Sequence, residues 1–364
     1  MNADKLTNTQ ISILIVNYML ATAILVLPRM LVDKAGTPDV WLSLMLAGVI
    51  SAAGGWLASR LSLSFPGETI FQYGRKLIGK GLGAAFGTSL VLYFLVICGL
   101  EARSLEEITT KYLLEGTPSW AVTLPFLWLG AYLVLGGIQA IVQASDLIFP
   151  LTGFILLVVL LLSLRVVEFS HLLPVLGQGL PPVLRSMKTA AFAYSGPELM
   201  LLLVAYMKRP RSAGKAYAAA IAICMAFYVV TTVIVIGAFS IDGVTLRTWP
   251  TIDLIRSFEI PGLIFERYES LILAIWIMKF FSTFVLALFA SSLGISQLFR
   301  VPFRTAVFAQ LPFIYIVQEL PKTIEDVFRV WDYLSMAGAA LSVGVPALLL
   351  VLQRWKKGAA HGRV

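Results

Sequence analysis

The chain has 364 residues, of which 59% are hydrophobic and 13% are charged, and its mean hydropathy is +0.87. These values exclude an ordinary water-soluble domain and indicate an all-α polytopic membrane protein, because helices satisfy their own backbone groups in lipid. The formal net charge of +8 comes from basic residues scattered among short loops, which is typical of a membrane protein and not of a nucleic-acid-binding surface.

A helix needs about 20 apolar residues to cross a bilayer. Ten segments approach that length, at about 11–30, 40–61, 84–105, 119–138, 146–166, 184–206, 213–239, 268–291, 303–320 and 333–353. A small majority of the Lys and Arg residues falls in loops on the side of the N-terminus, so we expect both termini in the cytoplasm. We therefore interpret residues 1–364 as one transmembrane domain embedded in a lipid bilayer.

The first segment carries Thr22 between the small residues Ala21 and Ala23. Small residues around a hydroxyl permit local unwinding of the helix, whereas close packing of two helices is the alternative interpretation. The triplet also fits a signal-peptide cleavage pattern, but the apolar run continues to Leu27 and we expect no cleavage.

Residues 65–80 follow the second segment and alternate apolar and basic side chains at near-helical spacing. They predict a short amphipathic helix at the cytoplasmic interface, which serves either as an anchor or in gating. In the third segment Tyr93 and Ile97 share one helix face, with Glu101 one turn further along. The Tyr93 hydroxyl either binds a ligand or caps another helix.

Two connections complete the first half. Residues 139–146 predict a polar turn between the fourth and fifth segments, and about 167–183 predict an irregular outer loop.

The sixth segment contains the run Ala193-Tyr194-Ser195-Gly196-Pro197-Glu198. Pro197 lacks an N–H group and clashes with the carbonyl four residues earlier, so a helix entering near 184 must break here. In hydrocarbon such a break survives only where it is buried in protein or lines a cavity, which makes it a candidate binding site. Glu198 is costly at this depth unless it faces polar partners or is protonated. The alternative is a proline kink in which Glu198 is tied to a neighbouring backbone group or lysine.

The second half contains a long outer loop and a buried lysine. Apolar residues between about 240 and 266, among them Trp249 and Phe258, predict a helical lid on the bundle, with a solvated connector as the alternative. Lys279 lies inside the eighth segment, and Ser282 and Thr283 occupy the same helical face. An ionisable residue at this depth suggests a function in ion or proton coupling. Three alternatives are open for Lys279. It could pair with Glu198, place its ammonium where related transporters hold sodium, or form a structural salt bridge that fixes two helices.

Ten spans divide into two halves of five, about 8–167 and 184–353, that enter the membrane in opposite orientations. Segments 1 and 6 are then equivalent, and both carry a candidate break. This layout predicts a transporter with an inverted repeat and a midplane site between two broken helices.

The sequence resembles the B subunits of spore germinant receptors, a branch of the amino acid–polyamine–organocation transporter superfamily. The resemblance covers most of the chain. It rests on Ile24-Leu25-Val26-Leu27-Pro28-Arg29, on Phe192 to Glu198 followed by Lys208-Arg209-Pro210, and on Trp249-Pro250-Thr251-Ile252-Asp253 followed by Phe265-Glu266-Arg267-Tyr268-Glu269-Ser270 and Ile275-Trp276-Ile277.

The resemblance implies a ten-helix LeuT-like fold, with helices 1 and 6 broken, in the bacterial cell membrane or spore inner membrane. It also implies an A subunit and a C lipoprotein as partners, and a small amino acid as the germinant. The implied binding residues are Ala21, Thr22, Ala23, Tyr93, Ile97, Phe192, Tyr194, Ser195, Gly196 and Thr283, with Glu198 and Lys279 as candidates for ion or proton coupling. Ala21 and Ala23 stand where such relatives usually carry glycine.

The alternative function is a proton-coupled amino acid transporter. No metal-ligand spacing, phosphate-binding loop or nucleophile motif occurs in a credible context. We therefore expect no enzyme activity, no cofactor and no metal.

Overall fold

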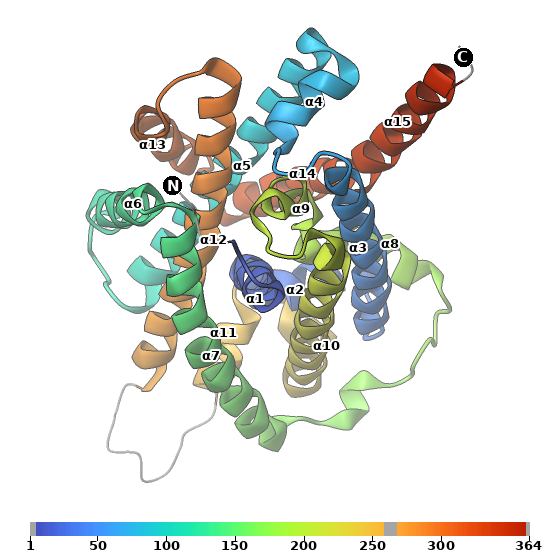
Figure 1. Cartoon of the computed structure of the whole chain (residues 1–364). Coiled ribbons are helices and arrows are strands. Elements are labelled where there is room, and N and C mark those ends of the chain that lie inside the picture. Colours follow the sequence, from blue (N-terminus) through green and yellow to red (C-terminus); the bar gives the residue numbers. More distant parts are fainter. Residues whose placement is uncertain (1–4, 258–267, 362–364) are drawn as a thin grey trace.

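The computed structural model describes residues 5–257 and 268–361. In these ranges the chain forms a helical bundle (Figure 1). The first half comprises α1 (Asn8–Met19), α2 (Thr22–Ala35), α3 (Val40–Leu63), α4 (Ile70–Ile78), α5 (Lys80–Tyr112), α6 (Ser119–Leu135) and α7 (Gly137–Ser163). The second half comprises α8 (Pro181–Ala190), α9 (Met200–Leu203), α10 (Ala213–Thr245), α11 (Pro250–Arg256), α12 (Tyr268–Phe299), α13 (Phe303–Glu319), α14 (Ile324–Ala339) and α15 (Val345–His361).

Six helical units among the described residues are long and apolar enough to cross a membrane, and the bent pair α1 and α2 makes a seventh. Helix α6 is apolar but shorter, while α13 and the α14–α15 pair coincide with the last two predicted segments. The polytopic helical class is therefore confirmed, and the count of ten spans stays a prediction. A π-helical stretch, Ala340–Gly344, joins α14 to α15 just before Pro346, where the missing N–H group disturbs the regular pattern.

The predicted polar turn at 139–146 is wrong, because α7 already begins at Gly137. Gly137 has a φ of +76°, a backbone conformation that glycine adopts without strain, so the chain reverses at once after α6. The polar residues that suggested a turn occupy the first turns of α7 instead.

The broken pair α1 and α2 lies near the middle of the bundle (Figure 1). Helix α1 packs against α7, α10 and α12, and α12 also packs closely along α5. The approach of α5 and α12 depends on Gly294, where an added Cβ would lie 2.4 Å from Cγ2 of Val91. Residues 14–28, the central part of the first span, are buried among these helices.

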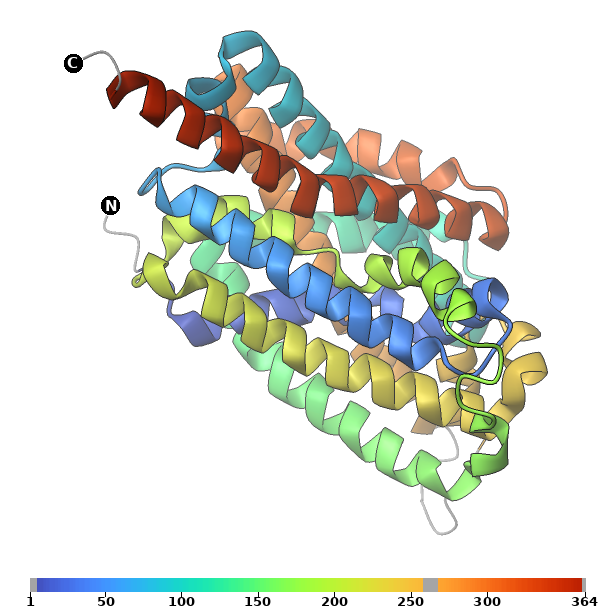
Figure 2. The same ribbon diagram turned by 90° about the vertical axis from the view of Figure 1, so that its right-hand side faces the viewer.

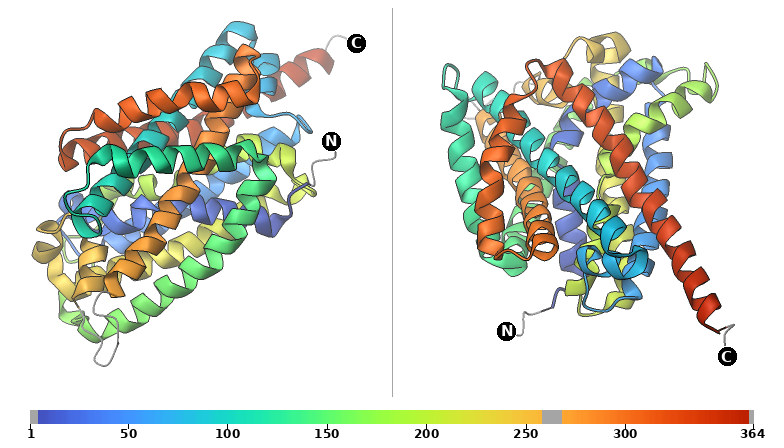
Figure 3. Two further views of the ribbon diagram at one scale, coloured as in Figure 1. Left: turned by 90° about the vertical axis from the view of Figure 1, so that its left-hand side faces the viewer. Right: turned by 90° about the horizontal axis from the view of Figure 1, so that it is seen from above.

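The start of α1 and the end of α15 lie toward the same end of the bundle, and α4 is near them (Figures 2 and 3). Helix α4 buries Ile70, Phe71, Tyr73 and Leu77 and exposes Lys76, which confirms the predicted amphipathic helix.

Helix α11 lies at the opposite end of the bundle (Figure 2). It buries Trp249, Ile252 and Leu254, and the Thr251 hydroxyl donates to the carbonyl oxygen of Ile24 at 2.8 Å. A lid resting on the first span is therefore confirmed over residues 250–256. Residues 240–245 of the predicted loop instead form the end of α10, and residues 258–266, including Phe258, lie outside the described residues.

Candidate functional site

The first span is interrupted between α1 and α2, which meet at an angle of 52°. The residues outside helical geometry are Leu20 (φ −83°, ψ 47°) and Ala21 (φ −109°, ψ −108°), whereas Thr22 and Ala23 already belong to α2. Alanine in place of glycine thus does not prevent the break, which is short. The residue before α2, Ala21, has no polar side-chain atom, so the first N–H groups of this helix receive no side-chain cap. This buried helix start is therefore a place where backbone N–H groups favour an anion.

The sixth span breaks at Ser195 and Gly196, between the 3-10 turns η3 (Ala191–Tyr194) and η4 (Pro197–Leu199). Pro197 occupies the first position of η4, as its missing N–H group requires. An added Cβ on Gly196 would lie 2.4 Å from the terminal methyl of Met19. The absence of a side chain at Gly196 therefore lets the two breaks meet.

Two hydroxyl groups hold the carbonyl end of α1. The Tyr228 hydroxyl, from α10, lies 2.5 Å from the carbonyl oxygen of Met19 and 3.0 Å from that of Ala193 in η3. The Thr283 hydroxyl, from α12, donates to the carbonyl oxygen of Tyr18 at 2.8 Å. A carbonyl oxygen has two lone pairs, so these oxygens keep the capacity to accept from a ligand ammonium.

Glu198 is fully buried and accepts two hydrogen bonds, one from the Gly196 amide at 3.0 Å and one from the Tyr93 hydroxyl at 3.1 Å. A carboxylate is favourable at the start of a helix, where the backbone presents its positive end. Glu198 thus occupies the start of the second half of the sixth span, one of the places expected for a ligand carboxylate. The start of α2 is the remaining position of this kind.

Lys279 lies on the other side of α1. Its ammonium donates to Oδ1 of Asn17 at 2.7 Å, and Nδ2 of Asn17 donates to the carbonyl oxygen of Ser145 at 3.0 Å. The ammonium also lies 5.8 Å from the ring centre of Phe149. Among the described residues no ion pair joins Lys279 to Glu198, so the suggested pairing of these two groups is wrong. Lys279 instead connects α1, α7 and α12.

A buried cavity of about 30 Å³ lies where the two breaks meet. Five of the predicted binding residues line it: Ala23, Ile97, Phe192, Ser195 and Thr283. The other five, Ala21, Thr22, Tyr93, Tyr194 and Gly196, do not line it, although each is buried nearby. The remaining lining residues were not among the predicted set: Tyr18, Met19, Glu101, Ala193 and Trp331.

Glu101 is the most informative of the residues missed. Its side chain is 3% exposed, lines the cavity and accepts a hydrogen bond from Oγ1 of Thr22 at 2.9 Å. Its spacing from Ile97 and Tyr93 places all three on one face of α5, and this spacing was the available signal. Trp331 had no such signal, because the fold alone brings α14 beside η3, with the rings of Phe192 and Trp331 4.7 Å apart.

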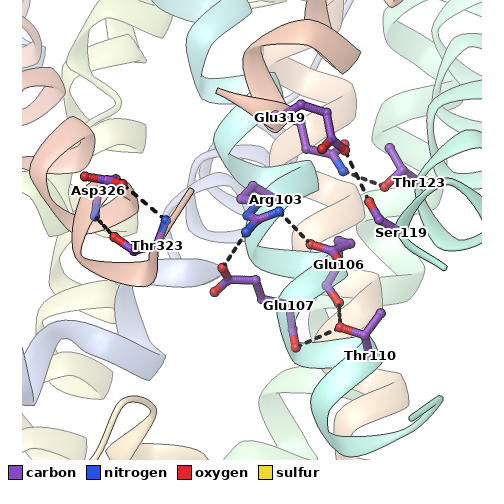
Figure 4. A network of polar contacts seen from close by, with 10 residues as sticks. Arg103, Glu106, Glu107, Thr110, Ser119, Thr123, Glu319, Thr323 and Asp326 are labelled. Carbon is purple, nitrogen blue, oxygen red and sulfur yellow. Dashed lines mark hydrogen bonds and ion pairs between the residues drawn. The ribbon is translucent and has the colours of Figure 1, made fainter. Parts of the chain in front are cut away.

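A separate polar cluster lies one turn beyond Glu101 on α5 (Figure 4). Arg103 pairs with Glu106 at 3.2 Å and with Glu107 at 3.1 Å, while Ser119 donates to Glu319 at 3.2 Å. These contacts involve the end of α5 and the facing ends of α6 and α13. No group of three or more His, Cys, Asp or Glu side chains able to hold a metal ion occurs in the described part of the chain.

The sequence matches one family of known proteins. Residues 5–327 match the model of a family described as "Spore germination protein". Spore germination protein YndE of Bacillus subtilis (strain 168) is 43% identical over 97% of this chain and 98% of its own length. Spore germination protein A2 of the same organism is 31% identical over 97% of this chain and 96% of its own length. GerLB of Bacillus cereus is 24% identical over 97% and 96%.

The fold resembles a solved transporter structure. Mhp1, a nucleobase-cation-symport-1 family transporter in a closed conformation with bromovinylhydantoin bound, matches with a TM-score of 0.59 at 14% identity, over 97% of this chain and 93% of Mhp1. This likeness concerns the fold and supports the expected LeuT-like class. From the family match and the identity to its relatives, the chain belongs to the spore germination protein family and is an integral membrane protein of the permease type.

Proposed function

We propose that the chain is the germinant-sensing subunit of a spore nutrient receptor. It binds a small amino acid between spans 1, 3, 6 and 8, which are the α1–α2 pair, α5, the α8–α9 segment and α12. The observation that carries this proposal is the meeting of two broken spans at a buried cavity that contains one carboxylate, Glu101. Broken helices at such a depth are typical of substrate sites in transporters. The family relationship supports a role in germination.

The cavity supplies a partner for each part of an amino acid. The Glu101 carboxylate and the carbonyl oxygens of Tyr18 and Met19 suit the ligand ammonium, and the uncapped start of α2 suits its carboxylate. The apolar lining from Ile97, Phe192 and Trp331 suits a small side chain.

The size of the cavity links binding to a conformational change. A volume of about 30 Å³ is far below the ~150 Å³ that admits a benzene-sized ligand. An amino acid therefore binds only when Phe192, Trp331 or the half-helices around them move apart. A ligand that binds one conformation in preference to another shifts the equilibrium between them. In a receptor this shift passes to partner subunits, for which the family resemblance suggests an A subunit and a C lipoprotein in the spore inner membrane.

A thermal-shift screen of the purified chain against common amino acids tests the binding step. We expect a subset of small amino acids to raise the melting temperature of the wild type, and Thr283→Leu to abolish this response because leucine adds bulk to the cavity. Thr152→Val is the matched control, since Thr152 is buried on α7, outside the cavity, and donates to its own helix at Ile148. An unchanged response in Thr283→Leu would count against the site.

The alternative, a proton-coupled amino acid transporter, is supported by the burial of two ionisable side chains, Glu198 at the break of the sixth span and Lys279 against α1. Uptake into proteoliposomes under a pH gradient separates the two functions. A sensor binds the amino acid without accumulating it, whereas a transporter accumulates it and loses uptake in Lys279→Met.

Both termini are proposed to face the cytoplasm. The termini lie toward one end of the bundle, so one experiment places both (Figure 3). The native cysteines, Cys98 and Cys224, are buried, so a cysteine added at either end reports its own side of the membrane. We expect it to resist an impermeant thiol reagent in intact cells and to react after permeabilisation.

A further inference from the structure

A basic pocket of about 290 Å³ lies between the end of α2, helix α8 and helix α14. Four cationic side chains line it, Lys34, Arg185, Lys188 and Arg329, against a single lining carboxylate, Asp332. The end of α2 and helix α8 lie at the end of the bundle opposite to the start of α1 and the end of α15 (Figure 2), which is the outer face in the proposed orientation. An excess of positive charge on this face is contrary to the usual distribution of Lys and Arg.

The charges in this pocket are only partly compensated. Lys34 pairs with Asp332 at 3.6 Å, and Arg329 pairs with Asp326 at 3.2 Å. The side chains of Arg185 and Lys188 are exposed on α8 and have no hydrogen bond or ion pair with another residue in the described ranges. Two cations one turn apart therefore face the pocket with their charge available for an anion.

An apolar crevice of about 220 Å³ adjoins the basic pocket, and the two share Lys188 and Met336 as lining residues. It runs between α3, η3 and α14, and Ile50 and Val343 are among the side chains that line it. Ile50 is 46% exposed and Met336 48% exposed on the outside of the bundle, which faces lipid in a membrane. At its inner end the crevice reaches Ser195, at the break of the sixth span.

We propose that the pocket and crevice together hold one anionic glycerophospholipid, with its phosphate at Arg185 and Lys188 and one acyl chain along the crevice. A small soluble anion would use only the basic pocket, and a neutral lipid would use only the crevice. The continuity of the two through Lys188 and Met336 favours a ligand that has both an anionic head and an apolar tail. Cationic side chains attract a lipid phosphate by charge, as basic pockets between transmembrane helices on the cytoplasmic side do for anionic head groups.

The position of the site gives the lipid access to the ligand-binding region. Ser195 lines both the crevice and the buried cavity between the breaks, so an acyl chain in the crevice contacts the same unwound segment that lines the cavity. The proposal does not depend on the identity of the germinant.

Lipid binding to the purified full-length chain tests the proposal by native mass spectrometry, with phosphatidylglycerol and phosphatidylcholine of identical acyl chains. We expect a preference for phosphatidylglycerol of roughly 30-fold from the two available cations. The double variant Arg185→Gln/Lys188→Gln removes these charges and should lose the preference. Arg165→Gln/Lys322→Gln is the matched control, because both residues are exposed and line neither space, and it should keep the preference.

Two further arms distinguish the possible occupants. Ile50→Trp narrows the crevice without changing a charge and should weaken phosphatidylglycerol binding. Glycerol phosphate, which has the head group but no tail, should bind the basic pocket far more weakly than phosphatidylglycerol binds. Equal binding of the two lipids by the wild type, retained preference in Arg185→Gln/Lys188→Gln, or binding of glycerol phosphate as strong as that of phosphatidylglycerol would overturn the lipid site.

Discussion

The hydroxyl of Tyr228 lies 2.5 Å from the carbonyl oxygen of Met19, where the first span ends its helix. The same hydroxyl is 3.0 Å from the carbonyl oxygen of Ala193, where the sixth span ends its own. Its one proton is donated to one of the two carbonyl oxygens at a time, but the two short distances place both breaks against α10. A single side chain outside the predicted site thus connects the two interruptions on which that site depends.

Tyr228→Phe is expected to lower stability by on the order of 1 to 3 kcal/mol, because buried carbonyl oxygens lose their donor while the ring is kept. The melting temperature of the purified chain measures this effect. Tyr132→Phe is the control, since Tyr132 is 77% exposed and should tolerate the change. Equal melting temperatures for Tyr228→Phe and the wild type would show that the hydroxyl does not brace the breaks.

Glu101→Gln is expected to weaken the binding of a responsive amino acid by roughly 10- to 100-fold, because hydrogen bonds to charged groups contribute about 1.5 to 3 kcal/mol. Binding of the corresponding carboxylic acid without its amino group should change little. Calorimetric titration of both ligands measures the difference. Glu319→Gln, altered on α13 outside the cavity, is the control. Equal losses of affinity for the two ligands would show that Glu101 does not bind the ligand ammonium.

The contact between Lys279 and Asn17 predicts coupled substitutions. Asn17→Leu should be more destabilising than Lys279→Met, because it leaves a buried cation without its acceptor. The double variant should cost less than the sum of the two single changes. Unfolding measurements on the four proteins test this, and additivity within about 0.5 kcal/mol would contradict a stabilising contact.

Gly338→Ala is expected to reduce the ligand response. An added Cβ at this position would lie 2.8 Å from the Tyr93 hydroxyl, so Tyr93 must shift and its hydrogen bond to Glu198 is disturbed. The control is Gly344→Ala, where an added Cβ meets nothing within 4 Å and alanine should be neutral or slightly stabilising. Thermal-shift titrations with a responsive amino acid compare the two. A similar response in both variants would show that the position of Tyr93 is not critical.

Local features of the sequence were sufficient for the membrane class, for the amphipathic helix α4 and for the break before Pro197. Each depends on properties of one segment: apolar length, periodicity, or the missing N–H group of proline. The turn into α7 was misplaced, because the polar residues after Gly137 suggested a turn that the two glycines had already made.

The hydrogen-bond partners of buried polar groups could not be predicted from local features of the sequence. Lys279 bonds to Asn17 and not to Glu198, and Thr22 bonds to Glu101 instead of lining the cavity. Neither choice is visible in residue spacing, because each depends on which helix faces which across the bundle.

The sequence by itself determined that this is a membrane protein of the spore germination family whose sixth span must break at Gly196-Pro197. Only the tertiary structure decided that Glu101 and Trp331 join the cavity and that Tyr228 braces both interruptions. A break is a property of the local backbone, whereas a cavity is made by side chains from helices far apart in the chain, whose positions depend on the packing of the whole bundle.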